Sequence, residues 1–212
     1  MKTFWLVSFM LTFVLAVLVA CNSKTDGKSD GGEGSGDSSD QRHAIVFKST
    51  GNPFGEKLME GFETAVEEAG GEAILRAPDQ PTVEGQIQII EELIAQKVDS
   101  ITIVGNDYDG LEPVLKKAKD QGIKVLSTDS AVNGNSRLVH VNQADPEAIG
   151  RIQIEAVSEM IGGEGQIAVL SATSQASNQN LWIEYMQKEL EKPEYENLEL
   201  VEIAYGDDLR DK

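Results

Sequence analysis

Residues 44–54 read AIVFKSTGNPF, an apolar run followed by a polar turn and the start of a helix. The run Ala44–Lys48 predicts a strand, because its β-branched and aromatic residues favour extended backbone. Asn52 followed by Pro53 predicts a helix N-terminus, since asparagine caps a first turn and proline fits the first helical position. The helix is expected to end at Gly70-Gly71 and to bury one stripe of residues spaced by three and four: Phe54, Leu58, Phe62, Ala65, Val66 and Ala69.

The same alternation of strand and helix continues along the chain. Asn142–Pro146 is interpreted as a crossing between two doubly wound lobes, residues 43–143 and 144–212, and a plain loop inside one continuous sheet is the alternative. Alternation of this kind is typical of an α/β fold in which helices cover both faces of a mostly parallel sheet. Further strands are predicted at residues 72–77, 100–104, 124–127, 137–141, 166–170 and 198–205.

Residues 1–20 have the layout of a signal peptide. Lys2 precedes a predominantly apolar run from Phe4 to Ala20, after which the chain becomes polar. A transmembrane anchor is the alternative, because the run is near the lower limit for spanning a bilayer. The sequence Leu18-Val19-Ala20-Cys21 matches the bacterial lipobox, which favours cleavage before Cys21 and lipidation of its thiol.

The segment that follows the cysteine is predicted to be a flexible linker. Residues 22–41 contain no aliphatic residue, so the segment cannot bury enough apolar surface to offset its ordering entropy. Residues 21–42 are therefore interpreted as a lipidated cysteine and a tether, with the folded part beginning at about residue 43.

Charge and motifs exclude several classes of function. The formal net charge of −18 argues against a nucleic-acid partner, which needs clustered lysine and arginine. The two histidines, His43 and His140, lie in predicted strands, and neither a nucleophile turn nor a zinc-binding pattern accompanies them. No glycine-rich dinucleotide motif follows the first strand. We therefore expect no enzyme activity, no metal and no cofactor.

Polar residues gather where the predicted strands end, which is where doubly wound sheets bind ligands. Hydroxyl groups of a sugar both donate and accept, so carboxylates and amides can hold them, while aromatic rings face the apolar side of the sugar. For Phe54 and Trp182 core packing is the alternative, and for Asp107 turn formation is the stronger one. The candidate ligand-binding residues are Lys48, Asn52, Phe54, Asn106, Asp107, Asp129, Asn142, Gln143, Asn178, Gln179 and Trp182.

On these residues the chain resembles the type I periplasmic sugar-binding proteins of bacterial ABC transporters, and within them the rhamnose-binding and autoinducer-2-binding receptors. The resemblance covers residues 44–212 and rests on four motifs. These are Lys48 with Gly51-Asn52-Pro53-Phe54, the run Val125-Leu126-Ser127-Thr128-Asp129-Ser130, Val141-Asn142-Gln143, and Asn178-Gln179-Asn180-Leu181-Trp182.

The resemblance implies a bilobal receptor that closes on one sugar by hinge motion and presents it to an ABC permease in the membrane. Lys48 and Asp129 would hold ligand hydroxyls from the first lobe, and Asn178 and Gln179 from the second. The autoinducer-2 receptors look to have an aspartate where this chain has Asn178, which favours a rhamnose-like sugar. Members of the family are longer than this chain, so the second lobe is expected to be incomplete.

The function expected from the resemblance is therefore that of a lipid-anchored solute-binding protein outside the cytoplasm, at the cell membrane. A receptor for autoinducer-2 or a sugar that signals to a membrane partner is the first alternative. A sugar-binding transcription regulator is disfavoured by the lipobox and by the lack of a basic helix-turn-helix before Ala44.

Overall fold

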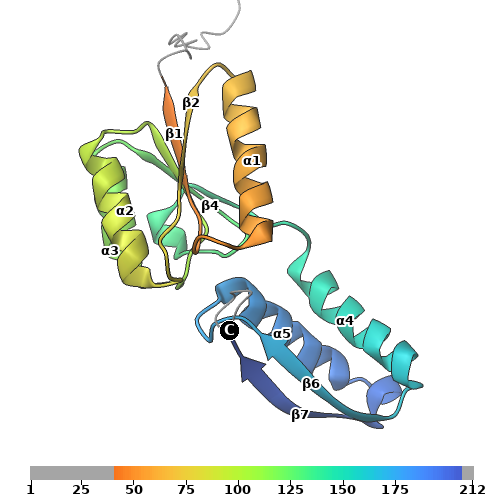
Figure 1. The fold of residues 1–212 in the computed structure, drawn as a ribbon. Coiled ribbons are helices and arrows are strands. Elements are labelled where there is room, and N and C mark those ends of the chain that lie inside the picture. The colour runs from red at the N-terminus through yellow and green to blue at the C-terminus, as the bar shows by residue number, and fades with distance from the viewer. Residues whose placement is uncertain (1–40, 207–212) are drawn as a thin grey trace, which may run out of the picture. The chain divides into compact units, whose positions relative to one another are not determined.

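The strand predicted from Ala44 becomes the second strand of a five-stranded parallel sheet in the computed structural model, which describes residues 41–206 (Figure 1). The signal peptide, Cys21 and nearly all of the linker predicted above lie outside the described residues. The sheet has the order β2-β1-β3-β4-β5. Its strands are β1 (Arg42–Val46), β2 (Glu72–Arg76), β3 (Ser100–Ile103), β4 (Lys124–Thr128) and β5 (Val139–Val141).

Two helices cover one face of this sheet, α2 (Val83–Ala95) and α3 (Glu112–Asp120) (Figure 1). Alternate strand residues point to this side, because side chains change face at each position of a strand. The result is a continuous buried core of aliphatic side chains that includes Ala44, Val46, Ile90, Leu93, Ile101, Ile103, Leu115 and Val125.

One helix, α1 (Pro53–Glu68), lies on the opposite face. The prediction that this helix buries one stripe of residues from Phe54 to Ala69 is wrong. The Phe54 side chain is 52% exposed, Ala65 and Ala69 are exposed, and Leu58 is only half-buried. Within residues 41–206, Figure 1 shows no second helix beside α1 on this face, so the flank of α1 has nothing to pack against. A cavity of about 360 Å³ lies between α1 and the sheet, lined by apolar residues that include Ile45 and Leu126.

The chain then forms a second, smaller α/β section. Its elements are α4 (Pro146–Ile161), β6 (Gly165–Ser171), α5 (Ser177–Leu190) and β7 (Leu198–Tyr205), together with a short 3-10 turn, η3 (Pro193–Tyr195). β6 and β7 pair in parallel, and both helices pack on one face of the pair around Ile154, Ile183 and Met186. Among the described residues no helix covers the other face, and Leu170 is exposed there.

A glycine sets how closely the two helices of this section approach. A Cβ at Gly150 of α4 would lie 2.7 Å from the carbonyl oxygen of Trp182 and 3.0 Å from the amide nitrogen of Met186, both in α5. Real Cβ atoms essentially never come so near backbone atoms, so only glycine allows this contact. This close contact between α4 and α5 fixes the position of the α5 face that carries Trp182.

The segment between the two sections is short, and Asp145 ends it as the N-cap of α4, where its carboxylate accepts from the amide of Ala148 at 2.7 Å. The α/β class and the parallel sheets predicted from the sequence are confirmed. The division into lobes at residues 143 and 144 stays a prediction. No helix of residues 41–206 is both long enough and apolar enough to cross a membrane.

Candidate functional site

A cavity of about 320 Å³ collects most of the predicted ligand-binding residues, and we call it the polar pocket. It lies beyond the carboxyl ends of β1 and β4 and at the first turns of α1 and α5. Doubly wound sheets bind ligands at this end of their strands. Its lining consists of Phe47, Lys48, Asn52, Phe54, Asp129, Gln143, Ile149, Asn178, Gln179 and Trp182.

A larger cavity of about 520 Å³ lies at the other end of the five-stranded sheet, where β1, β3 and β4 begin. Lys97, Asp99 and Lys124, which border it, are exposed. Strand beginnings are not where ligands collect in this class of fold, and none of the predicted site residues is there. We therefore place the candidate site in the polar pocket.

Asp129 is the buried acid of the polar pocket. It follows β4 with φ of 57°, a left-handed conformation that is uncommon for residues other than glycine but that aspartate and asparagine tolerate best, and only 7% of the residue is exposed. Its amide donates to the carbonyl oxygen of Val141 at 3.1 Å, and its Oδ1 accepts from Asn178 Nδ2 at 3.0 Å. Backbone strain that surrounding bonds enforce is typical of a residue held in place for binding.

Lys48 brings a buried cation to the same pocket. The residue is 5% exposed and lies two residues after the end of β1, and its carbonyl oxygen accepts from Asn106 Nδ2 at 2.9 Å. Both Lys48 and Asp129 have further interactions within the protein. One cation and one anion are the charged groups of the lining, so the pocket has no net formal charge.

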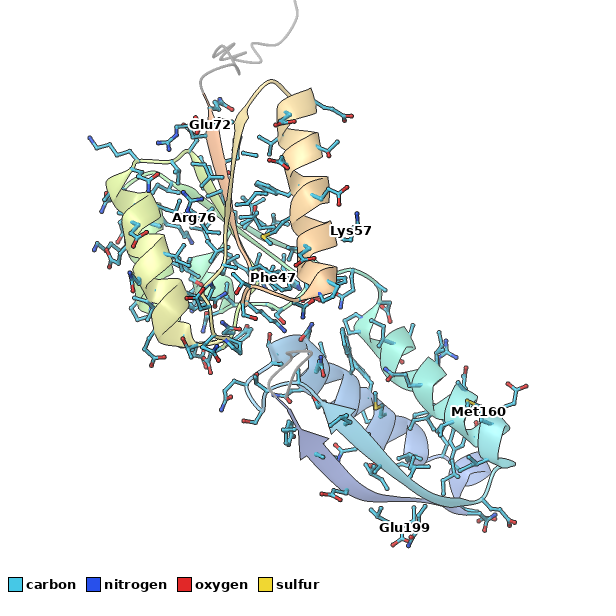
Figure 2. All side chains as sticks on the ribbon, viewed as in Figure 1. Phe47, Lys57, Glu72, Arg76, Met160 and Glu199 are labelled. Atoms are coloured by element: carbon cyan, nitrogen blue, oxygen red, sulfur yellow. The ribbon has the colours of Figure 1, made fainter. Side chains whose placement is uncertain are left out.

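The first turn of α1 supplies the aromatic side of the pocket. Asn52 caps the helix, with its Oδ1 accepting from the amides of Phe54 at 3.0 Å and Gly55 at 3.1 Å. The rings of Phe47 and Phe54 have centroids 6.4 Å apart and are tilted by 52°. A Cβ at Gly55 would overlap the ring of Phe47, so the glycine lets that ring lie under α1. Figure 2 shows Phe47 at the foot of α1.

The first turn of α5 supplies two amides and an indole. Asn178 is buried, and its Oδ1 accepts from the amide of Gln179 at 2.8 Å. Gln179 Oε1 in turn accepts from Ser171 Oγ at 2.9 Å and from the amide of Ala172 at 2.8 Å, at the end of β6. Trp182 lies one turn later, where it packs against the core of this section and also borders the pocket.

Three predicted residues do not line the polar pocket. Asn106 is buried and donates from Nδ2 to the carbonyl oxygens of Lys48 and Thr82, which ties the ends of the strands together. Asp107 forms the expected turn, with Oδ1 accepting from the amides of Asp109 and Gly110.

Asn142, the third of these residues, lies with its Oδ1 2.7 Å from Nε2 of His140. Asn106, Asp107 and Asn142 therefore shape loops around the pocket.

Phe47 and Ile149 line the polar pocket although the sequence did not single them out. Phe47 was predicted only as part of the first strand, and it is almost fully buried. Its position as the last apolar residue before Lys48 is the signal that could have marked it, because a strand's last residues face the ligand end of the sheet. Ile149 lies in the first turn of α4. Its spacing from the other apolar residues of α4 is the spacing of an ordinary core residue, so no signal in the sequence marked it.

The histidines take part in structural hydrogen bonds. His43 Nδ1 lies 2.7 Å from Ser100 Oγ, and His140 Nδ1 lies 2.8 Å from Ser127 Oγ, so each ring joins two neighbouring strands. Burial lowers the pKa of His140 below its usual value. Among residues 41–206 no group of three or more histidine, cysteine, aspartate and glutamate side chains is arranged to hold a metal ion.

Comparison with known proteins gives one family and many related structures. A family model described as "Periplasmic binding protein domain" matches residues 43–212. A solved ABC transporter solute-binding protein from Clostridium phytofermentas with bound L-rhamnose is 46% identical to this chain and superposes with a TM-score of 0.78. A solute-binding protein from Burkholderia graminis in complex with D-arabinose is 31% identical, with a TM-score of 0.75.

These relatives extend well beyond the matched part. The match covers 79% of this chain and 52% of the Clostridium structure, and 81% and 58% for the Burkholderia structure. The D-ribose/D-allose-binding protein of Pseudomonas aeruginosa is 34% identical over 92 residues, which are 42% of this chain and 29% of that protein. All three are described as binding proteins and not as enzymes, and the two structures confirm the predicted α/β fold.

Proposed function

This chain belongs to the periplasmic binding protein domain family, and we propose that it is a solute-binding protein of an ABC importer that takes up a monosaccharide. The observation that carries the proposal is the polar pocket, in which Lys48 and Asp129 meet Asn178 and Gln179 beside three aromatic side chains. The pocket combines donors, acceptors and apolar surface in one cavity, as a small polyol requires.

The charges and the size of the pocket favour a neutral monosaccharide. An ammonium group donates, a carboxylate accepts and an amide does both, so the lining can satisfy hydroxyl groups of either orientation. A ligand with a net charge would leave Lys48 or Asp129 uncompensated in a buried site, which is costly. The volume of about 320 Å³ is at the small end of the range for ligand pockets.

Within this class we propose a rhamnose-like sugar. The relative with bound L-rhamnose is 46% identical, more than the arabinose-bound relative at 31%. Phe47, Phe54 and Ile149 form an apolar part of the lining, against which the methyl group of a 6-deoxyhexose would lose its contact with water. Binding of autoinducer-2 or a sensory role is the second candidate, and the amide of Asn178 in place of a carboxylate argues against autoinducer-2.

We further propose that the protein acts outside the cytoplasm and is held at the membrane by a lipid on Cys21. The family supports an extracytoplasmic location, and the lipobox before Cys21 supports the anchor. Residues 43–143 and 144–212 would form two lobes that close on the sugar, with an ABC permease as the partner that receives it.

Thermal unfolding of the full chain with a panel of sugars tests the proposal. Pentoses, hexoses, 6-deoxyhexoses and autoinducer-2 are added separately, because a ligand that binds the folded state alone must raise the unfolding temperature. L-rhamnose is expected to give the largest increase. A cooperative transition that no sugar shifts would overturn the function, and a larger shift with autoinducer-2 would overturn the sugar assignment.

A further inference from the structure

Two adjacent residues of α5 contact the loop that follows β4, and only one of them lines the polar pocket. Asn178 donates to Asp129 Oδ1 inside the pocket. Ser177 Oγ donates to the carbonyl oxygen of Ala131 at 2.8 Å, and neither Ser177 nor Ala131 is part of the lining. The Ser177 bond therefore joins the two sections of the protein without touching the ligand space.

The acceptor of this bond is held firmly. The amide of Asp129 donates to Val141, and the carbonyl oxygen of Ser130 accepts from Gly105 at 3.0 Å. Val132, the next residue, is fully buried, and a Cβ at Gly105 would lie 2.7 Å from its Cγ1, so the loop packs closely on the chain after β3. The carbonyl group of Ala131 is consequently a fixed point of the five-stranded section.

The donor is held equally firmly from its own side. Gln179 accepts two hydrogen bonds from the end of β6, and Asn180 Nδ2 donates to the carbonyl oxygen of Ser174 at 2.8 Å. Ala176, at the N-cap position, makes no side-chain hydrogen bond to the helix. The Ser177 hydroxyl, although it lies at the start of a helix, is used for the contact with Ala131 instead of for capping.

We propose that Ser177 is a positioning residue that aligns the first turn of α5 with the Asp129 loop and so sets the affinity for every ligand of the pocket. This inference rests on the proposed function, because it concerns the same site. Because the bond is made outside the pocket, its loss should weaken all ligands by a common factor and leave their ranking unchanged. A single hydrogen bond of this kind corresponds to a change of roughly fivefold in Kd.

The test compares Ser177→Ala, Ser177→Thr and the unchanged full chain by calorimetric titration with the sugar panel. Ser177→Ala should raise Kd about fivefold for each sugar that binds. Ser177→Thr keeps the hydroxyl and should restore most of the affinity. The control is Ser174→Ala, since Ser174 is exposed and its hydroxyl makes none of the hydrogen bonds found within residues 41–206. Equal affinities in all variants, or a changed ranking of sugars, would overturn the inference.

Hydrogen exchange separates this inference from the proposed function. Peptides that cover residues 129–133 and 176–180 should both exchange faster in Ser177→Ala and not in Ser174→Ala, whether or not a sugar binds. If no sugar binds the unchanged chain while both peptides respond, the proposed function falls, whereas the alignment of the two segments by Ser177 stands. Unchanged exchange in both peptides would refute the positioning role, whatever the titration shows.

Discussion

The side-chain amide of Asn178 lies 3.0 Å from Oδ1 of Asp129, which joins the first turn of α5 to the loop after β4. The two residues are 49 positions apart in the sequence: Asp129 follows a strand of the five-stranded sheet, and Asn178 lies in a helix that packs on the β6–β7 pair. Both are buried, and both line the polar pocket. A sugar hydroxyl in this pocket would lie near the carboxylate of Asp129 and the amide of Asn178, so that two distant segments of the chain would bind the same small molecule.

Replacing the carboxylate of Asp129 should remove most of the ligand affinity. Asp129→Asn keeps the shape of the side chain and tolerates the left-handed backbone, but it lacks the charge that strengthens hydrogen bonds to hydroxyls. We expect Kd for the preferred sugar to rise roughly ten- to hundredfold by calorimetric titration. Asp120→Asn, at an exposed carboxylate of α3, is the control and should bind normally. Equal affinity in both variants would mean that the site lies elsewhere.

Gly55→Ala should destabilise the protein because the new Cβ would overlap the ring of Phe47. Overpacking of this kind costs about 1–3 kcal/mol, and we expect a loss of that size in the free energy of unfolding measured with urea. Gly61→Ala in the same helix is the matched control, since a Cβ there meets nothing within 4 Å. It should stabilise the protein by up to about 1 kcal/mol. Similar effects of the two changes would contradict the close packing at Phe47.

Lys97→Gly should increase the free energy of unfolding. Lys97 has φ of 55° after α2, and the amide of Val98 closes the helix end by donating to Leu93. Relief of the left-handed strain, of about 1–2 kcal/mol, should outweigh the greater flexibility of glycine in the unfolded chain, of about 0.5–1 kcal/mol. Gly122→Lys makes the reverse change at the equivalent end of α3, where φ is 89°, and should destabilise. Urea denaturation measures both, and a stabilising Gly122→Lys would contradict the argument.

His140 should make the folded state less stable as the pH falls. Burial lowers the pKa of its ring in the folded protein, so the unfolded chain takes up a proton more readily. The stability that this histidine contributes is complete above its usual pKa and is lost as the pH decreases through the lowered pKa of the folded state. The free energy of unfolding of the unchanged chain, measured from pH 8 to pH 5, should therefore fall more than that of His140→Gln. Parallel profiles would exclude this role.

Cys21→Ser should release the protein from membranes. The lipobox before Cys21 predicts that acyl chains on the thiol provide the anchor, and serine cannot carry them in a thioether. Fractionation of cells that express the full chain should move the protein from the membrane to the soluble fraction. Ser23→Ala, two residues later, should stay with the membrane. Retention of Cys21→Ser in the membrane fraction would favour an uncleaved apolar anchor.

The positions of strands and helices followed from the period of apolar residues, which needs no knowledge of distant contacts. The predicted strand at residues 198–205 coincides with β7, and the predicted strand at residues 124–127 differs from β4 by one residue. The burial of α1 was predicted wrongly because its apolar stripe shows which side faces the sheet, whereas the amount of burial depends on neighbours beside the helix. Phe54, which lines the polar pocket, is thus half-exposed.

The sequence predicted those residues of the candidate site whose position follows from the end of a strand. Lys48 and Asp129 lie within two residues of the ends of β1 and β4, and parallel strands bring such positions to one edge. Asn106 and Asp107 satisfy the same rule, yet they hydrogen-bond to loops, and no pattern within their own segments distinguishes the two outcomes. The type I periplasmic-binding-protein fold indicated by the resemblance is confirmed by the related structures.

By itself the sequence determined the α/β class, the element boundaries within a few residues, and the polar character of the strand ends, because these depend on local propensity and periodicity. Only the tertiary structure decided which of those polar side chains share a cavity, that Phe47 belongs with them, and that Ser177 bonds Ala131 outside it. Hydrogen bonds and close packing between distant segments depend on distances of a few tenths of an ångström, which are set only when the whole chain has folded.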